Sequence, residues 1–191
     1  FPTHVKLSVP DGQKAEVVII NGVECEPYLT SDYRNTMERT EMILTGTEIV
    51  MRAVGVSRAV IGVENNKTDA IAKLREIIAR DKYEGIEVMP LKMRYPQGGE
   101  KQLIAAVTGR QVPPPPALPI SVGAVVCNVS TAIAIYEAVQ KNKPLIERVV
   151  SVTGKELKST HNYLARFGTP ASRFFELAGI PEGDVKLLNG G

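Results

Sequence analysis

The sequence predicts an α/β fold, in which a mostly parallel sheet carries helices on both faces and a smaller α+β unit follows. Three observations support this prediction. Short apolar runs rich in β-branched residues recur along the chain, and helical periodicities lie between them. Near Pro144 the pattern of apolar and polar residues changes. Alternation of strands and helices is typical of parallel sheets whose faces are covered by helices.

Four apolar runs supply the strands of the predicted sheet. They are Val17–Ile20, Ala59–Val63, Ile86–Met89 and Gly123–Val126. Three of these runs are near-continuously apolar, which is expected when both faces of a strand are buried.

Apolar residues spaced three and four apart predict helices between and after these strands. The apolar stripes run over Met42–Ala53, Ile71–Ile78, Leu103–Val107 and Ile133–Val139. Pro113–Pro116 can be neither helix nor central strand, because proline fixes φ and lacks a backbone N–H. We therefore expect a stiff surface loop there.

From about Pro144 the pattern predicts a small α+β unit over 144–191. Arg148–Thr153 alternates like a strand, a helix is expected over Ser172–Ala178, and Val185–Leu188 is a candidate strand. No methionine precedes Phe1 and the sequence stops in a turn-like Asn-Gly-Gly, so we expect the natural protein to be longer.

The charge balance rules out neither a nucleic-acid nor a membrane partner, but the composition favours neither. The chain has 191 residues, a net charge of +2 and 43% hydrophobic residues, with no basic patch of the kind that indicates nucleic-acid binding. No signal peptide is expected at the start of the given sequence, and no apolar run approaches the ~20 residues of a membrane span. Cys25 and Cys127 are too few for an iron–sulfur cluster or a zinc site. A cytosolic setting is the default expectation.

Polar groups follow each predicted strand. The segments are Asn21–Tyr28, Glu64–Lys67, Lys92–Lys101 and Asn128–Thr131. Ligands of open parallel sheets bind outside the carboxyl ends of the strands. Because four strand ends deliver polar groups to one rim, the sequence predicts a ligand site there.

Simpler structural roles remain open for several of these residues. Asn66 suits the N-cap of the helix that follows it, and Asn128 and Thr131 suit the start of another helix. Gly98 and Gly99 suit a tight turn, although glycines before a helix also let backbone N–H groups approach a phosphate.

Glu24 and Glu26 stand one residue apart and are expected to point the same way on an extended segment. A solvated loop, a ligand rich in hydroxyls and amides, and a metal ion all remain open, although no histidine lies near to favour a metal. No nucleophile–base arrangement is visible, because His4 and His161 are far apart and the glutamates beside Cys25 disfavour its thiolate. Because no catalytic side chain is evident, we expect a cofactor to carry out any reaction.

Four segments in register resemble the C subunit of the Rnf complex, a bacterial and archaeal ferredoxin:NAD oxidoreductase component. They are Phe1–Leu7, Asn21–Tyr28, Tyr95–Ile104 and Asn128–Ala132. Cobalamin-reductase relatives share the Glu-Cys-Glu-Pro element, whereas the Gly-Gly-Glu-Lys-Gln-Leu-Ile stretch is more similar to Rnf. The flavin-bearing, NADH-oxidising subunit of respiratory complex I is a more distant relative with the same motif order.

The resemblance implies a Rossmann-like domain over 1–143 that binds FMN and NADH and is truncated at its N-terminus. It also implies a partial β-grasp domain of the soluble-ligand-binding (SLBB) type over 144–191, matched at Gly168–Pro170 and Gly190–Gly191. In the family, [4Fe-4S] clusters belong to a C-terminal region that is missing from this chain.

The resemblance also assigns roles to particular residues. FMN contacts fall on Lys6, Asn21, Glu24, Tyr95, Gly98, Asn128 and Thr131. NAD(H) contacts fall on Phe1, Glu26 and Glu100. No catalytic side chain and no metal ligand is assigned. The chain departs from complex I at Val23, Gly99 and Cys127, where the complex I protein has aspartate, glutamate and asparagine. The glycine-rich half of the flavin loop would precede Phe1.

The implied activity is hydride transfer between NAD(H) and FMN, followed by single-electron transfer to iron–sulfur centres. Expected partners are the other subunits of a membrane electron-transport complex, NADH and, indirectly, ferredoxin, with no nucleic acid and no direct membrane insertion. The expected location is cytoplasmic, peripheral at the inner face of the prokaryotic membrane. A cobalamin-reductase-like flavoprotein and a non-catalytic docking or ligand-binding module are the alternatives.

Overall fold

The computed structural model describes residues 2–180 and 183–190, and the chain divides into two compact units. The first unit contains residues 1–25 and 32–144, and the second contains residues 26–31 and 145–191. Phe1, to which the sequence assigns an NAD(H) contact, lies outside the described residues.

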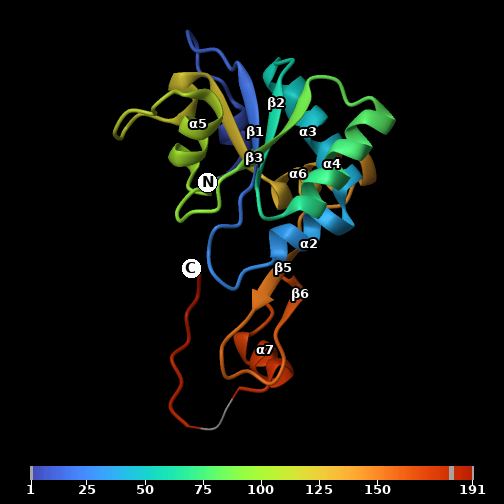
Figure 1. Ribbon diagram of the computed structural model, residues 1–191, viewed down its shortest axis with the longest axis vertical. Helices are drawn as coiled ribbons and strands as arrows, with labels where there is room; N and C mark the ends of the chain where they lie inside the picture. The colour runs from blue at the N-terminus through green and yellow to red at the C-terminus, as the bar shows by residue number, and fades with distance from the viewer. Residues whose placement is uncertain (1, 181–182, 191) are drawn as a thin grey trace. The chain divides into compact units, whose positions relative to one another are not determined.

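In the described part of the first unit, four strands form one parallel sheet (Figure 1). They are β1 (Val17–Gly22), β2 (Ala59–Glu64), β3 (Ile86–Leu91) and β4 (Ala124–Asn128). Their order is β3-β2-β1-β4, with every neighbouring pair parallel. All four predicted strands and their parallel arrangement are confirmed. The strand order reverses between β1 and β4, and such a switch point is where open α/β sheets bind their ligands.

Helices cover both faces of this sheet, as predicted. One face carries α3 (Thr40–Val54), α4 (Thr68–Asp81) and α6 (Val129–Lys141), and α5 (Glu100–Thr108) covers the other (Figure 1). Successive strand residues point to opposite faces, so Val18 and Ile20 join the core beneath α3, α4 and α6, whereas Val17 and Ile19 join the core beneath α5. This two-sided burial explains the near-continuous apolar runs of the strands.

The remaining elements of the first unit are short. They are α1 (Thr3–Leu7), α2 (Ser31–Glu38) and a 3₁₀ turn at Pro119–Val122. The sequence did not predict α1 or α2, because neither carries an extended apolar stripe. Pro113–Pro116 lies in an irregular, exposed segment, as expected. No helix among the described residues is long and apolar enough to cross a membrane.

Gly46 allows α3 and α6 to pack closely. A Cβ atom built on this glycine would lie 2.1 Å from the Ala132 carbonyl oxygen of α6, so no larger residue fits without a shift of the backbone. The α3–α6 contact in turn fixes the start of α6, which follows β4 directly.

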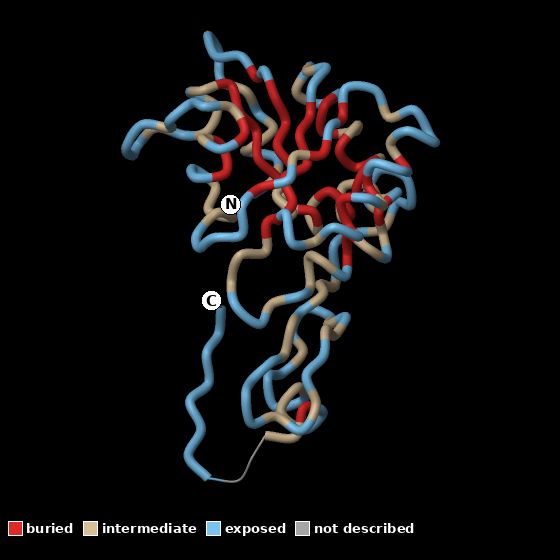
Figure 2. Tube along the Cα trace, viewed as in Figure 1, coloured by how far each residue is buried: buried red, intermediate tan, exposed pale blue. Residues whose placement is uncertain are grey.

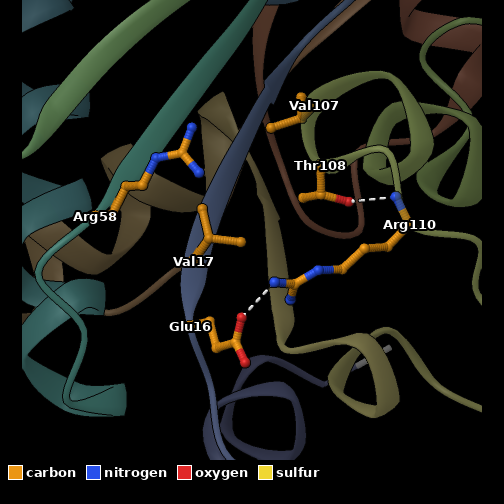
Figure 3. Close-up of a pocket in the computed structure, with 6 residues that line it drawn as sticks. All are labelled: Glu16, Val17, Arg58, Val107, Thr108 and Arg110. Atoms are coloured by element: carbon orange, nitrogen blue, oxygen red, sulfur yellow. Dashed lines mark hydrogen bonds and ion pairs between the residues drawn. The ribbon is translucent and has the colours of Figure 1, made fainter.

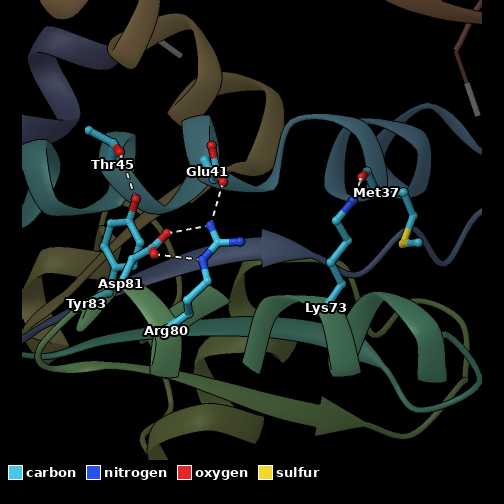
Figure 4. A network of polar contacts seen from close by, with 7 residues as sticks. All are labelled: Met37, Glu41, Thr45, Lys73, Arg80, Asp81 and Tyr83. Atoms are coloured by element: carbon cyan, nitrogen blue, oxygen red, sulfur yellow. Dashed lines mark hydrogen bonds and ion pairs between the residues drawn. The ribbon is translucent and has the colours of Figure 1, made fainter. Parts of the chain in front are cut away.

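Polar contacts on the outer surface join α4 to α3 and α2 (Figure 4). Arg80 pairs with Glu41 of α3 at 2.7 Å, and Lys73 Nζ donates to the Met37 carbonyl of α2 at 2.5 Å. Because Arg80 and Glu41 are more than half exposed, their ion pair contributes little stability.

The second unit is described by itself. Strands β5 (Glu147–Val152) and β6 (His161–Arg166) pair antiparallel, and α7 (Ala171–Ala178) follows. The rings of Tyr163 and Phe174 pack at 5.7 Å between centroids. Ala178 is the only buried hydrophobic residue in the described part of this unit, which is mostly pale blue and tan in Figure 2.

The predicted strand at Val185–Leu188 is wrong. Residues 183–190 have no regular structure, and Val185, Leu187 and Leu188 are exposed. A strand needs a neighbour to satisfy its backbone N–H and C=O groups, and no described strand pairs with this segment. The strand near 147–152 and the helix near 171–178 are confirmed, whereas β6 was missed because His161 and Asn162 begin it with polar residues.

Candidate functional site

At the carboxyl end of β1, the Asn21 amide ties two loops together. Its Oδ1 accepts from Val23 N at 3.1 Å, and its Nδ2 donates to the Gly98 carbonyl at 2.8 Å. Gly98 N in turn lies 3.3 Å from Cys25 Sγ. A Cβ atom on Gly98 would lie 2.2 Å from the Val23 carbonyl oxygen, so this close approach requires glycine. The loop after β1 and the loop before α5 therefore form one surface.

The Glu24 carboxylate lies at the first turn of α2. Its two oxygens accept from Asp32 N at 3.0 Å and Tyr33 N at 3.2 Å. The first N–H groups of a helix have no partner within the helix, and a carboxylate there also faces the positive end of the helix dipole. Glu24 thus holds α2 beside the loop that follows β1.

Asn128 caps α6, so the structural role that the sequence left open for it is confirmed. Its Oδ1 accepts from Ser130 N at 2.8 Å, and its Nδ2 donates to Asp32 Oδ2 at 2.6 Å. Ser130 Oγ donates to Asp32 Oδ1 at 3.0 Å, and Thr131 is half-buried in the first turn of α6. Asp32 therefore joins the starts of α2 and α6 at the β1/β4 switch point.

Lys6 and Glu100 form an ion pair of 2.6 Å at the start of α5. Lys6 Nζ also donates to the Val126 carbonyl of β4 at 3.1 Å. Their side chains are 28% and 39% exposed, so solvent screens this pair only in part. Burial raises the pKa of the nearby Cys127 thiol, an effect that Lys6 opposes, so Cys127 stays a neutral thiol at ordinary pH.

The other assigned residues do not join these contacts. Tyr95 precedes a cis peptide bond to Pro96, and the residue is 71% exposed. Glu26 belongs to the second unit. The N-cap predicted at Asn66 is wrong, because α4 is preceded by Lys67 as its N-cap residue, and Asn66 Nδ2 instead contacts Met93 Sδ at 3.1 Å.

Sequence reasoning missed individual roles for Asp32, Ser130 and Glu64. Asp32 could have been found as an acidic residue in the first turn of a helix, had α2 been recognised. Glu64 ends β2 and is only 4% exposed. Burial raises the pKa of the Glu64 carboxyl above its usual value, while Lys67 lowers it and Glu24 raises it further.

A pocket of about 310 Å³ lies at the opposite end of the sheet (Figure 3). It is lined by Glu16, Val17, Arg58, Val107, Thr108 and Arg110. These residues surround the amino end of β1 and the last turn of α5, away from the strand ends that bind ligands in parallel sheets. We therefore do not assign the ligand site to this pocket. The described residues contain no cluster of three or more His, Cys, Asp or Glu that could hold a metal ion.

Comparisons with known sequences identify relatives along the whole chain. The family model of the Nuo51 FMN-binding domain matches residues 1–137. The C subunit of the proton-translocating ferredoxin:NAD(+) oxidoreductase complex of Clostridium ljungdahlii is 43% identical over 100% of this chain and 41% of that protein. The C subunit of the Na(+)-translocating complex of Acetobacterium woodii is 44% identical over 100% of this chain and 43% of that protein. This chain therefore spans less than half the length of these two relatives.

Solved structures show the same fold. The NAD+-reducing [NiFe]-hydrogenase in its H2-reduced state matches 93% of this chain and 35% of the hydrogenase chain, with a TM-score of 0.81 and 20% identity. Its air-oxidised state gives a TM-score of 0.78 and 22% identity. The fold expected from the resemblance is thus confirmed. The match of the family model over residues 1–137 shows that the chain belongs to the Nuo51 FMN-binding domain family, and along its whole length it is similar to the C subunits of ion-translocating oxidoreductase complexes.

Proposed function

We propose that this chain is the FMN- and NAD(H)-binding part of a subunit that carries electrons between NAD(H) and ferredoxin in an ion-translocating membrane complex. The observation that carries the proposal is the carboxyl edge of the sheet at the β1/β4 switch point. There Asn21, Gly98 and Asn128 meet beside the starts of two helices, in a chain of the Nuo51 FMN-binding family.

The residues at this edge suit a flavin mononucleotide. The N-termini of α5 and α6 offer backbone N–H groups and positive dipole ends, which favour a phosphate, and Asn128 and Thr131 lie at the start of α6. Gly98 has no side chain to obstruct close approach of a flat ring. The amide of Asn21 can both donate and accept hydrogen bonds.

Bound FMN would supply the hydride and single-electron chemistry, for which no side chain of this site is suited. The protein's own part is orientation, because two reacting rings held at near-attack distance react far faster than free ones. Glu24 holds α2 in place through two backbone N–H groups, and Lys6 neutralises Glu100 at the start of α5.

The remaining assignments form part of the same proposal. Residues 1–143 would be the FMN/NADH-binding domain, with Lys6, Glu24 and Tyr95 completing the flavin contacts. Phe1, Glu26 and Glu100 would contact NAD(H). Residues 144–191 would be part of a β-grasp domain, and iron–sulfur clusters elsewhere in the full-length protein would accept single electrons.

Partner subunits would hold the protein at the inner face of the membrane. The names of the relatives support this part of the proposal, because each is a subunit of an ion-translocating complex.

A flavin titration of the purified full-length protein tests the proposal. We expect FMN to bind with quenching of its fluorescence, and NADH then to bleach the visible absorbance of the bound flavin. Asn128→Ala should weaken FMN binding, whereas Arg110→Gln at the amino-edge pocket should not. Absence of FMN binding by the wild-type protein would contradict the proposal and favour a non-catalytic docking module.

A further inference from the structure

Glu64 differs from the other buried polar residues of the described chain. Asn35, Thr36, Thr40 and Thr47 are similarly buried, and each side chain forms a hydrogen bond. The Glu64 carboxylate forms neither a hydrogen bond nor an ion pair within 4 Å with any described residue, although Glu64 is only 4% exposed. A buried carboxylate without a partner is rare and destabilising.

The Glu64 oxygens are not completely cut off from solvent. Every side-chain nitrogen or oxygen that is fully cut off from solvent has a hydrogen-bond partner among the described residues. The unpaired carboxylate of Glu64 therefore retains some solvent contact, despite the burial of the residue as a whole.

Strand geometry places Glu64 on the face of the sheet that carries Asn21. Val60 and Ile19 both pack in the core beneath α5, and residues two and four positions further along a strand point to the same face. Asn21 is in register with Gly62, and Glu64 lies two residues beyond Gly62 toward the carboxyl edge. Glu64 thus extends the surface formed by Asn21 and Gly98.

The charges around Glu64 determine which kind of ligand group can bind there. Lys67 offsets the negative potential that Glu24 adds, so the charge that repels a phosphate from this position is that of the Glu64 carboxylate itself. A carboxylate accepts hydrogen bonds and donates none, which suits the hydroxyls of a sugar or sugar alcohol. Hydrogen bonds to a charged acceptor are also stronger than neutral ones.

We propose that Glu64 is a further ligand-binding residue, which accepts hydrogen bonds from the ribityl hydroxyls of the flavin nucleotide. The inference rests on the proposed function, because it names the part of FMN that this edge of the sheet recognises. It assigns the ribityl chain to the β2 side of the site and leaves the phosphate to the helix N-termini.

Three flavins separate the possibilities in the purified full-length protein: FMN, riboflavin, which lacks the phosphate, and lumiflavin, which lacks both the phosphate and the ribityl chain. Glu64→Gln should weaken the binding of FMN and of riboflavin by about tenfold or more, since a charge-assisted hydrogen bond is lost. Lumiflavin affinity should change less than about twofold. Glu87→Gln removes an exposed carboxylate near the amino end of β3 and should leave all three affinities unchanged.

Thermal unfolding of the flavin-free proteins separates binding from folding. Glu64→Gln removes an uncompensated buried charge, so its melting temperature should equal or exceed that of the wild type. Glu64→Asp keeps the charge but shortens its reach, and should weaken FMN binding with the fold intact. Unchanged FMN affinity in Glu64→Gln would overturn this inference and leave the proposed function standing. A wild-type protein that binds no FMN would overturn both.

Discussion

The two ends of the parallel sheet use polar residues in opposite ways. At the amino end, Glu16 pairs with Arg110 and Arg58 pairs with Glu87, and all four side chains are about half exposed beside an open pocket. At the carboxyl end, Asn21 and Asn128 form hydrogen bonds with backbone carbonyls that are distant in sequence, and Glu24 accepts from the backbone of α2.

The pocket and the proposed ligand site therefore lie at opposite ends of the sheet and differ in how their polar residues are bonded. Exposed ion pairs gain little because water screens them and holding long side chains in place costs entropy. Amide and carboxylate groups bonded to backbone set the geometry of a loop, which is what a ligand requires. Substitutions at the carboxyl edge should therefore affect both stability and binding, whereas those at the amino edge should affect neither.

The largest effect is expected for Gly98→Ala. Its Cβ would meet the Val23 carbonyl at 2.2 Å, so the loop before α5 must move away from β1. We expect a loss of about 1–3 kcal/mol in the free energy of unfolding, measured by urea denaturation, together with weaker FMN binding. Gly154→Ala is the control, because the new methyl group would meet only the movable side chain of Leu157. Equal effects at the two glycines would break the comparison.

The next largest effect is expected for Asn128→Ala, which removes both the cap of α6 and the donor to Asp32. The expected cost is about 1–2 kcal/mol in the free energy of unfolding. Asn66→Ala alters an exposed asparagine that caps no helix and should cost much less. If Asn66→Ala proved as costly as Asn128→Ala, helix capping would not explain the role of Asn128.

Glu64 gives the carboxyl edge a pH dependence. Because burial raises the pKa of its carboxyl above the ordinary 4.5, the folded state holds this proton more tightly than the unfolded state. Its contribution to stability is therefore full below pH 4.5 and is lost as pH rises through the folded pKa. The flavin-free Glu64→Gln variant should gain stability relative to wild type across that window, measured by urea unfolding at several pH values. A difference that stays constant with pH would contradict this assignment.

The smallest effect is expected for Arg110→Gln at the amino-edge pocket. The Glu16–Arg110 pair is 2.6 Å long, but both side chains are about half exposed. We expect a change within about 0.5 kcal/mol and no change in FMN affinity. A tenfold loss of FMN affinity would instead move the ligand site to this pocket.

Most of the first unit could be predicted because its strands and helices carry clear periodicities. Val17–Ile20 and Ala59–Val63 are apolar at every position, which only a strand buried on both faces explains well. Strand order could not be read from the same pattern. Helix α2 was missed because its residues are mostly polar and its position depends on Glu24, eight residues before Asp32.

The location of the candidate site could be predicted from the sequence, but the hydrogen bonds between its residues could not. Polar residues after each strand indicated the carboxyl edge, since parallel strands deliver their ends to one rim. The partners of Glu24 and Asn128 depend on how loops fold back, and no periodicity encodes that. Glu64 could not be recognised as buried, because a glutamate at a strand end is usually exposed.

The hydrogen bond from Lys6 to Val126 has a consequence for association between molecules. Among the described strands, β4 stands at the end of the sheet with β1 as its one neighbour. Exposed end strands invite pairing with strands of other chains and so promote aggregation, and a lysine at such a strand opposes it. By donating to the Val126 carbonyl, Lys6 occupies one backbone acceptor of β4 that a strand of another chain would otherwise use.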